Sequence, residues 1–183
     1  MINKIIAFFL IIFLFPIFLF VSFLILISDG RPILFWSRRV GLNNTFFFMP
    51  KFRTMKKKTP DLPTHELNNP QDYLIRFGTG LRKASLDELP QLYCILMGNL
   101  NFVGPRPALH NQVDLISKRL TCDIHKIKPG ITGWAQVNGR DEISIEKKVS
   151  LDTYYLKNRS IFLNTKIILL TFIQIFRSKG VRH

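Results

Sequence analysis

Residues 5–27 read IIAFFLIIFLFPIFLFVSFLILI and decide the fold of this 183-residue chain. They are 23 consecutive residues without a charged side chain, dense in Phe, Ile and Leu. Roughly 20 apolar residues in a helix match the hydrocarbon core of a bilayer. The run is longer than that of a usual signal peptide, and the following Ser28-Asp29-Gly30 does not resemble a small-residue cleavage site. The sequence therefore predicts a membrane anchor over residues 1–30.

Pro16 divides this segment into two apolar arms, residues 5–15 and 17–27. Proline removes a backbone donor and clashes with the preceding turn, so the helix has to kink or break there. Two arrangements follow: a kinked helix that crosses the membrane, or a helix-break-helix that dips in and returns. Cations flank both sides, Lys4 before and Arg31 after, so the positive-inside rule does not force the two ends into different compartments.

Residues 31–183 are long enough for one further domain with its own core. Short β-like runs at 32–36 and 45–49, separated by a turn composition, predict a β-hairpin near the membrane surface. Apolar periodicity predicts helices over 144–157 and 161–176, the second one interfacial or buried. We therefore expect an α+β fold: a membrane anchor followed by a small domain of helices with a short β-hairpin, partly embedded at the membrane interface.

Composition narrows the classes of partner. The chain has 26 Lys plus Arg against 12 Asp plus Glu, a formal net charge of +14. This charge attracts polyanions, which include nucleic acid, anionic lipid headgroups and phosphorylated small molecules. Cys94 and Cys122 are the only cysteines, and their spacing supports neither a disulfide framework nor a zinc site. Reduced thiols on the cytosolic side fit this pattern best.

The acidic pair Asp87-Glu88 is the strongest candidate for chemistry, because cationic segments surround it. Arg82 precedes the pair, and the segment 103–107, VGPRP, follows it. Ser85 and Glu88 have the spacing of a capping box, in which Glu88 reaches back to the N-cap; in an alternative register the helix begins at the next proline. Both registers put the pair at a helix N-terminus, where partial positive charge keeps a carboxylate ionised and attracts phosphate.

The two acids should have different roles, because adjacent residues on a helix point about 100° apart. An ionised Asp87 near phosphorus can act as a nucleophile or a metal ligand, while Glu88 manages a proton. Each also has a simpler explanation: Asp87 complements the helix dipole, and Glu88 completes the cap. Arg106, between Pro105 and Pro107, suits bidentate phosphate recognition, or it is an exposed arginine of an ordinary turn.

Three more arginines complete the candidate ligands for a phosphate or a nucleotide-sugar: Arg53, Arg82 and Arg140. Arg53 lies in a basic segment, and Arg140 follows Trp134, which either contacts a base or sugar or packs in a β-hairpin. Residues 59–71 hold several prolines and few periodic apolar positions, and this loop could fold over a substrate. Asp141-Glu142 is an equal acidic pair without a following proline-braced arginine, and we interpret it as a solvated helix start.

In order and spacing, four segments resemble the bacterial sugar transferase family, the monotopic phosphoglycosyl transferases. They are 51–55 (KFRTM), 86–91 (LDELPQ), 103–107 (VGPRP) and 128–140 (KPGITGWAQVNGR). The resemblance implies a Mg²⁺-dependent reaction at the cytosolic face of the bacterial inner membrane. Asp87, which also shares the magnesium ion with the substrate phosphates, attacks the sugar-bearing phosphate of a UDP-sugar and releases UMP. The sugar phosphate then passes to polyprenol phosphate.

The resemblance also implies a re-entrant membrane segment, broken near its centre by a Ser-Pro step. Pro16 matches that proline, whereas Phe15 stands where the serine would be. The expected partners are a UDP-sugar, polyprenol phosphate and membrane lipids, and not nucleic acid. The chain resembles the minimal catalytic form of the family, and its oligomeric state stays open, a dimer included.

Three competing functions follow from the same residues. The net charge suggests a membrane-anchored nucleic-acid-binding module, which would give no reason for Asp87-Glu88 beside Arg106. A second is a non-enzymatic scaffold of a glycan-assembly complex, and a third is a hydrolase that sends the sugar phosphate to water. Release of UMP would exclude the scaffold, and formation of a lipid product would exclude the hydrolase.

Overall fold

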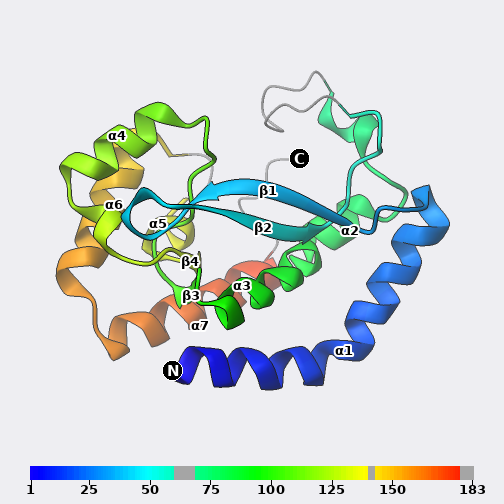
Figure 1. Ribbon diagram of the computed structural model, residues 1–183, viewed down its shortest axis with the longest axis horizontal. Coiled ribbons are helices and arrows are strands. Elements are labelled where there is room, and N and C mark those ends of the chain that lie inside the picture. The colour runs from blue at the N-terminus through cyan, green and yellow to red at the C-terminus, as the bar shows by residue number, and fades with distance from the viewer. Residues whose placement is uncertain (60–68, 140–142, 178–183) are drawn as a thin grey trace.

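The computed structural model describes residues 1–59, 69–139 and 143–177 (Figure 1). The helices and strands follow one another in the order α1 (Ile2–Asp29), β1 (Leu34–Val40), β2 (Phe46–Phe52), α2 (Gly78–Lys83), α3 (Leu92–Met97), β3 (Asn101–Val103), α4 (Val113–Thr121), β4 (Gly130–Thr132), α5 (Trp134–Val137), α6 (Ile145–Asn158) and α7 (Ile161–Arg177). Short 3₁₀ helices lie at Leu42–Asn44, Pro70–Tyr73, Leu86–Gln91 and Ile124–Lys126. The fold mixes helices and strands, as the sequence predicts.

The anchor helix α1 is continuous and sharply bent. Pro16 lies inside it, and helical geometry persists on both sides, so the predicted break is a kink. Proline removes only its own hydrogen bond, and the neighbouring turns can keep theirs. In Figure 1 the first arm runs below α3 and the second rises toward the start of β1. Within the described ranges, α1 is the one helix long and apolar enough to cross a membrane.

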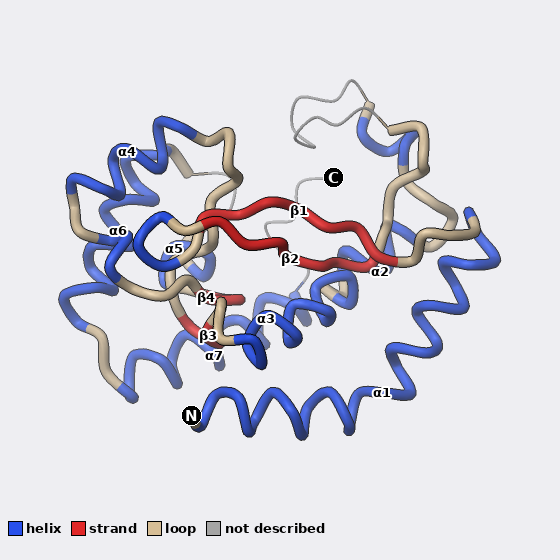
Figure 2. The backbone as a smooth tube through the Cα atoms, viewed as in Figure 1, coloured by secondary structure: helices blue, strands red, loops and turns tan. Residues whose placement is uncertain are grey.

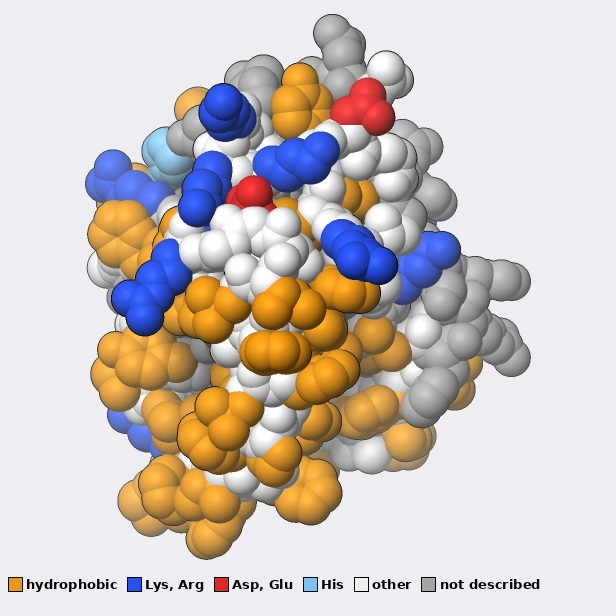
Figure 3. All heavy atoms as spheres, turned by 90° about the vertical axis from the view of Figure 1, so that its right-hand side faces the viewer, with side chains coloured by type: hydrophobic (Ala, Val, Ile, Leu, Met, Phe, Trp, Pro, Cys, Tyr) orange, Lys and Arg blue, Asp and Glu red, His pale blue; other side chains and the backbone are white. Residues whose placement is uncertain are grey.

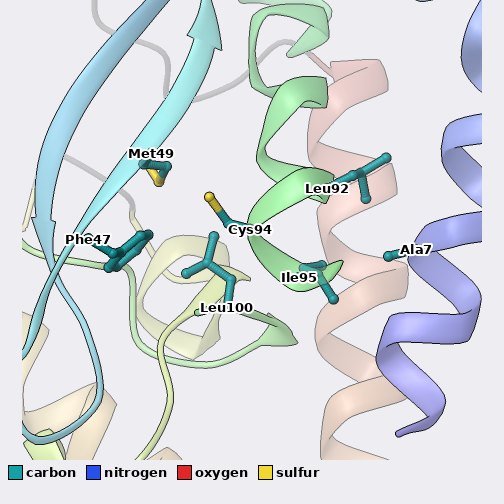
Figure 4. Close-up of a cluster of buried hydrophobic side chains, with 7 residues drawn as sticks. All are labelled: Ala7, Phe47, Met49, Leu92, Cys94, Ile95 and Leu100. Carbon is teal, nitrogen blue, oxygen red and sulfur yellow. The ribbon is translucent and has the colours of Figure 1, made fainter. Parts of the chain in front are cut away.

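Both arms of α1 pack against the rest of the protein. Ala7 on the first arm is fully buried against α3, as Figure 4 shows. On the second arm, Val21 and Ile25 are fully buried beside Phe52 of β2. Most of the remaining apolar surface of the helix is exposed among the residues that the structure describes. The large side chains that stay exposed include Phe8, Phe9, Ile12, Phe13, Phe15, Leu19, Phe20 and Phe23.

Strands β1 and β2 form the predicted antiparallel hairpin, with Leu34 opposite Phe52. The hairpin crosses the middle of the molecule in Figure 2. Side chains alternate between the two faces of a strand, and on β2 this alternation directs Phe47 and Met49 into the core. Figure 4 shows Met49 facing Cys94 of α3. The hairpin and α3 thereby share one hydrophobic cluster with the first arm of α1.

A second, smaller sheet joins distant parts of the chain. β3 and β4 pair in parallel, with Asn101 opposite Gly130. The two backbones approach so closely that a Cβ on Gly130 would lie 2.2 Å from the amide nitrogen of Gly104. Of the two interpretations of Trp134, the one that places it in a β-hairpin is wrong, because β4 pairs with β3 and Trp134 opens the short helix α5. A three-residue parallel strand has too few residues to show a period of its own.

The C-terminal helices α6 and α7 confirm the helices predicted for this region. Ser144 caps α6, and its hydroxyl accepts a hydrogen bond from the Lys147 amide at 3.2 Å. α7 buries Leu163 and Ile167 in a cluster with Tyr155 of α6. Its opposite face is apolar and exposed, with Ile161, Phe162, Leu169, Phe172 and Ile173 among its members.

Candidate active site

Asp87 and Glu88 lie in the first turn of the 3₁₀ helix Leu86–Gln91, which continues into α3. The predicted capping box is not formed. Ser85 has a left-handed backbone, φ 55°, and its side chain makes no capping hydrogen bond. Instead, the amide of Glu88 donates to the backbone carbonyl of Ser85 at 3.2 Å. The N-terminal position of the acidic pair is confirmed, and a backbone turn produces it.

Glu88 is held by two cations from different parts of the chain. Its Oε1 accepts hydrogen bonds from Lys51 Nζ of β2 at 2.7 Å and from Arg106 Nη2, after β3, at 2.8 Å. Burial raises the pKa of Glu88, but the charges and hydrogen bonds of Arg106 and Lys51 outweigh it and lower the pKa well below its usual value. Glu88 is therefore ionised at neutral pH, and its low pKa suits a group that positions the two cations better than a group that donates a proton.

Asp87 lies beside the same charges, but its pKa is shifted in the opposite direction. Its side chain is buried, with 9% relative exposure. Burial, followed by repulsion from Glu88, raises its pKa to about 6, against the attraction of Lys51, Arg82 and Arg106. A carboxyl group that titrates close to neutral pH can be ionised and yet remain reactive. The two adjacent acids thus occupy environments that push their pKa values apart.

Arg82 contributes positive charge to the site from α2. Its Nε donates to Thr54 Oγ1 at 2.9 Å, and its charge attracts Asp87. Burial lowers the pKa of this guanidinium, which still remains charged because its usual value is so high. Arg82, Lys51 and Arg106 come from three separate segments. Together they form a cationic enclosure around the two carboxylates, suited to a substrate that carries several phosphate charges.

Arg53 is buried, with 6% relative exposure, at the junction between α1 and β1. A guanidinium has five N–H donors, and in Arg53 they all bind nearby oxygens. The acceptors are the carboxylate and the carbonyl of Asp29 and the carbonyls of Gly30, Pro32 and Met55. A substrate phosphate would have to displace these bonds. These hydrogen bonds indicate that Arg53 holds the end of α1 against the domain, and they do not support the expected role in substrate binding.

Other candidates lie outside this arrangement. Arg140 and the comparison pair Asp141-Glu142 are outside the described residues, as is most of the loop expected to fold over a substrate. Trp134 stacks on Tyr154, with ring centroids 5.7 Å apart, and Lys166 Nζ lies 5.5 Å from its ring. Packing inside the protein therefore accounts for Trp134.

Lys51 is the site residue that the sequence analysis missed. Lys51 belongs to the same sequence motif as Arg53 and precedes it by two positions. A signal was present, because the period of two that turns Phe47 and Met49 inward continues to Lys51. Following the alternation along β2 would have placed the ammonium group on the inner side of the hairpin.

The carboxylates suit a magnesium ion that the substrate helps to bind. No cluster of three or more His, Cys, Asp or Glu side chains lies within the described part of the chain. Mg²⁺ commonly binds one or two carboxylates and takes its other ligands from substrate phosphates and water. Asp87, buried near Arg82 and Arg106, offers this kind of donor at the place where phosphates would lie.

Comparison with known proteins gives consistent matches. The sequence pattern described as bacterial sugar transferase matches residues 1–178. The chain is 41% identical over 166 residues to the uncharacterized sugar transferase EpsL of Bacillus subtilis (strain 168). This alignment covers 91% of this chain and 81% of the relative. It is 38% identical over 187 residues to the UDP-glucose:undecaprenyl-phosphate glucose-1-phosphate transferase of Xanthomonas campestris pv. campestris, covering 97% and 38%.

A third relative carries a different sugar in its name. The UDP-N-acetylgalactosamine-undecaprenyl-phosphate N-acetylgalactosaminephosphotransferase of Aeromonas hydrophila is 33% identical over 172 residues, covering 91% of this chain and 41% of the relative. The chain thus spans most of the shorter relative and about two fifths of these longer ones. Because the matching region includes the anchor helix and all the segments that bring Asp87, Glu88 and Arg106 together, the chain belongs to the bacterial sugar transferase family.

Proposed function

We propose that this protein is a phosphoglycosyl transferase, which moves a sugar 1-phosphate from a UDP-sugar to polyprenol phosphate with release of UMP. This would be the first membrane step in the assembly of a glycan. The observation that carries the proposal is Asp87, a buried carboxyl group with a pKa of about 6 inside a cationic enclosure. The names of relatives, which include undecaprenyl-phosphate transferases of glucose and of N-acetylgalactosamine phosphates, support this reaction class.

In the first step, the ionised carboxylate of Asp87 attacks the phosphorus that bears the sugar. A bond forms between a carboxylate oxygen and this phosphorus, and the bond to the UMP oxygen breaks, so UMP leaves with its electron pair. Arg82, Arg106 and Lys51 offset the negative charge that gathers around the phosphorus. Glu88, fixed by Lys51 and Arg106, keeps these two cations in place beside the nucleophile.

In the second step, the lipid phosphate takes the place of UMP. An oxygen of polyprenol phosphate attacks the phosphorus of the acyl phosphate on Asp87, and the carboxylate leaves. The product is a polyprenyl-diphosphate sugar, and Asp87 returns to its ionised form. The same cations serve both steps because both transfers occur at one phosphorus.

Magnesium fits this site as a partner of the substrate. Asp87, together with the substrate phosphates, would hold the ion, which supplies charge neutralisation during phosphoryl transfer. The cations of the protein bind and orient the phosphates on the remaining sides, and the burial of Asp87 limits the access of water to the acyl phosphate.

The anchor is proposed to enter and leave the bilayer on one side. Two bonds at opposite ends of α1 support this geometry, because both lead to the same domain. Asn3 Nδ2 donates to Asn101 Oδ1 at 3.1 Å near the start of the helix. At its end, Arg53 Nη2 donates to the Gly30 carbonyl at 2.6 Å. A straight helix crossing the membrane would separate these two ends by the thickness of the bilayer.

The domain is proposed to rest on the cytosolic surface of the inner membrane. Figure 3 views the side on which the second arm of α1 lies, with apolar side chains gathered below and Lys and Arg side chains above. This division matches the boundary between hydrocarbon and anionic headgroups. The exposed apolar face of α7, including Phe162 at 81% and Phe172 at 57%, would lie along the same interface.

The proposal is tested by substitution at the acidic pair. Asp87→Asn should abolish both UMP release and a covalent phosphosugar adduct, because an amide cannot act as the nucleophile. Glu88→Gln should retain the nucleophile and be slowed severely, since Lys51 and Arg106 lose their shared anchor. UMP release from a panel of UDP-sugars, with mass spectrometry of the intact protein, measures both. Near-normal turnover by Asp87→Asn would show that the nucleophile lies elsewhere.

The acceptor is tested separately. With polyprenol phosphate present, the sugar phosphate should appear in the lipid fraction, in an amount that matches the UMP released. Sugar 1-phosphate in the aqueous fraction, with no lipid product, would indicate a hydrolase. The panel also identifies the sugar, which differs between the named relatives.

A further inference from the structure

The loop that presents Arg106 is held through its backbone. Three consecutive carbonyls accept hydrogen bonds: Pro105 from the Gly130 amide at 3.0 Å, Arg106 from Arg119 Nη1 at 2.8 Å and Pro107 from Arg39 Nη1 at 3.2 Å. The Gly130 bond comes from the start of β4, the strand that pairs with β3. The two arginine bonds come from side chains outside that sheet, Arg119 on α4 and Arg39 on β1, and both reach the backbone of the loop.

Arg119 is itself fixed by a buried carboxylate. Asp152 of α6 has 1% relative exposure, and its Oδ2 accepts from Arg119 Nε at 3.0 Å and from Nη2 at 2.6 Å. Burying such a pair carries a large desolvation cost, and apolar residues of similar volume often stabilise a fold as well or better. Stability is therefore a weak explanation for this pair. The pair makes one further hydrogen bond, from Arg119 Nη1 to the Arg106 carbonyl, and this bond connects the pair to the active site.

We infer that Arg119 and Asp152 are positioning residues for phosphosugar transfer, which act by fixing the backbone of Arg106. The chain of contacts runs from Asp152 on α6, through Arg119 on α4, to the Arg106 carbonyl, and from the Arg106 guanidinium to Glu88 beside Asp87. The inference rests on the proposed function for its kinetic consequence. Neither residue touches the reacting atoms, and a shift of about 1 Å in a group that does can cost roughly a hundredfold in rate.

The same two helices supply a matched control. Lys118, next to Arg119 on α4, pairs with Glu146 on α6. This pair is solvent-exposed, with side-chain relative exposures of 46% and 67%. Among the described residues, neither side chain hydrogen-bonds to the loop at Arg106. Removing it changes the α4–α6 contact and the surface charge without touching the path to the active site.

The test replaces each pair by apolar residues. Arg119→Met with Asp152→Leu removes both charges together, so no buried charge is left unpaired and the fold should keep its melting temperature within a few degrees. We expect kcat/KM for UMP release to fall about tenfold to a hundredfold. Lys118→Met with Glu146→Leu should stay within about twofold of the unsubstituted protein. If the first variant does not fold, Arg119→Lys replaces it, because an ammonium keeps the ion pair and lacks the planar fork that reaches both partners.

A double-mutant cycle separates positioning from general damage. Arg106→Met removes the guanidinium that the pair is inferred to position. In that background, the apolar replacement of Arg119 and Asp152 should lower kcat/KM by less than about twofold, since the effect of the pair has already been lost. An equal loss in the presence and absence of Arg106 would overturn the inference, as would full activity of the apolar pair in the unsubstituted protein.

A substrate-free measurement keeps the two proposals distinguishable. Amide hydrogen exchange of Gly104, Arg106 and Ala108, the residues of this loop that have an amide hydrogen, should be faster in the apolar pair variant than in the Lys118 and Glu146 control. If the unsubstituted protein released no UMP but exchange responded in this way, the proposed function would be wrong and the bracing of the loop would stand. Unchanged exchange with normal UMP release would reject the bracing alone.

Discussion

At the scale of single residues, the site depends on two adjacent carboxyl groups whose pKa values the fold shifts in opposite directions. Glu88 has two hydrogen-bonded cations and a pKa well below its usual value. Asp87 is buried beside Glu88, and its pKa is raised to about 6. Ionisation of Glu88 therefore stabilises the folded protein, whereas ionisation of Asp87 opposes folding. The chain retains a destabilising charge at the position that we propose for the nucleophile.

This difference predicts that Asp87→Asn stabilises the magnesium-free protein at pH 8 and has little effect at pH 4. The folded pKa of about 6 exceeds the unfolded value of about 3.9, so the free energy of unfolding falls as pH rises from about 4 to about 6. A difference of about two units between the folded and unfolded pKa corresponds to about 3 kcal/mol of lost stability. The neutral amide that replaces the Asp87 carboxyl group does not carry this cost. Denaturant unfolding of the detergent-solubilised protein at the two pH values measures the effect.

Glu88→Gln provides the control with the opposite sign. Its folded pKa lies below the unfolded value, so ionisation contributes stability above about pH 4.3, and that stability is lost as pH falls through the folded pKa. The substitution should destabilise the protein at pH 8, also because Lys51 and Arg106 lose their acceptor. If both substitutions destabilised the protein at pH 8, Asp87 would not carry the unfavourable charge assigned to it.

At the scale of elements, the junction between α1 and β1 predicts a structural role for Arg53. Arg53→Met should lower the free energy of unfolding by on the order of 3 kcal/mol, because buried oxygens lose their donors. Arg38→Met is the control: Arg38 is exposed, 4.2 Å from the centroid of the Phe46 ring, and should cost at most about 1 kcal/mol. A raised KM for the UDP-sugar with unchanged stability would instead assign Arg53 to substrate binding.

Elements with a repeated local signal could be predicted from the sequence. The hairpin of β1 and β2 and the helices α6 and α7 each show their period within a short window. That the capping box at Ser85 does not form could not be predicted from a local pattern, because the partners of Glu88 lie 37 and 18 residues away in the sequence. The same holds for Arg119 and Asp152, which are 33 residues apart. Motif spacing identifies which residues take part, and tertiary contacts decide what each one does.

At the scale of the whole molecule, the bent anchor and the acidic pair belong to one structural unit. The first arm of α1 packs against α3, which directly follows the turn that carries Asp87. The second arm packs against Phe52, at the end of the strand that supplies Lys51. In the proposed membrane placement, the depth of α1 in the bilayer therefore sets the height of the active site. A water-soluble UDP-sugar and a lipid phosphate can meet only near the membrane surface.

This arrangement predicts that both ends of α1 are reached from the same side of the membrane. Cys122 is replaced by Ser, while Cys94 stays in place because burial raises its pKa to about 11 and leaves it unreactive. Single cysteines at the exposed positions Ile2, Arg31 and Lys58 should all react with an impermeant maleimide in inverted vesicles, and none should react in spheroplasts. Labelling at position 2 only in spheroplasts would establish a crossing helix.

Pro16→Leu tests what holds the first arm in place. The substitution restores the missing hydrogen bond and permits a straight helix of 28 residues, roughly 42 Å at about 1.5 Å per residue, which is long enough to cross. If the kink directs the first arm back to the domain, a cysteine at position 2 should become reachable from outside in this variant. Unchanged labelling would mean that the bond of Asn3 to Asn101 and the burial of Ala7 against α3 are sufficient to return the chain to its starting side.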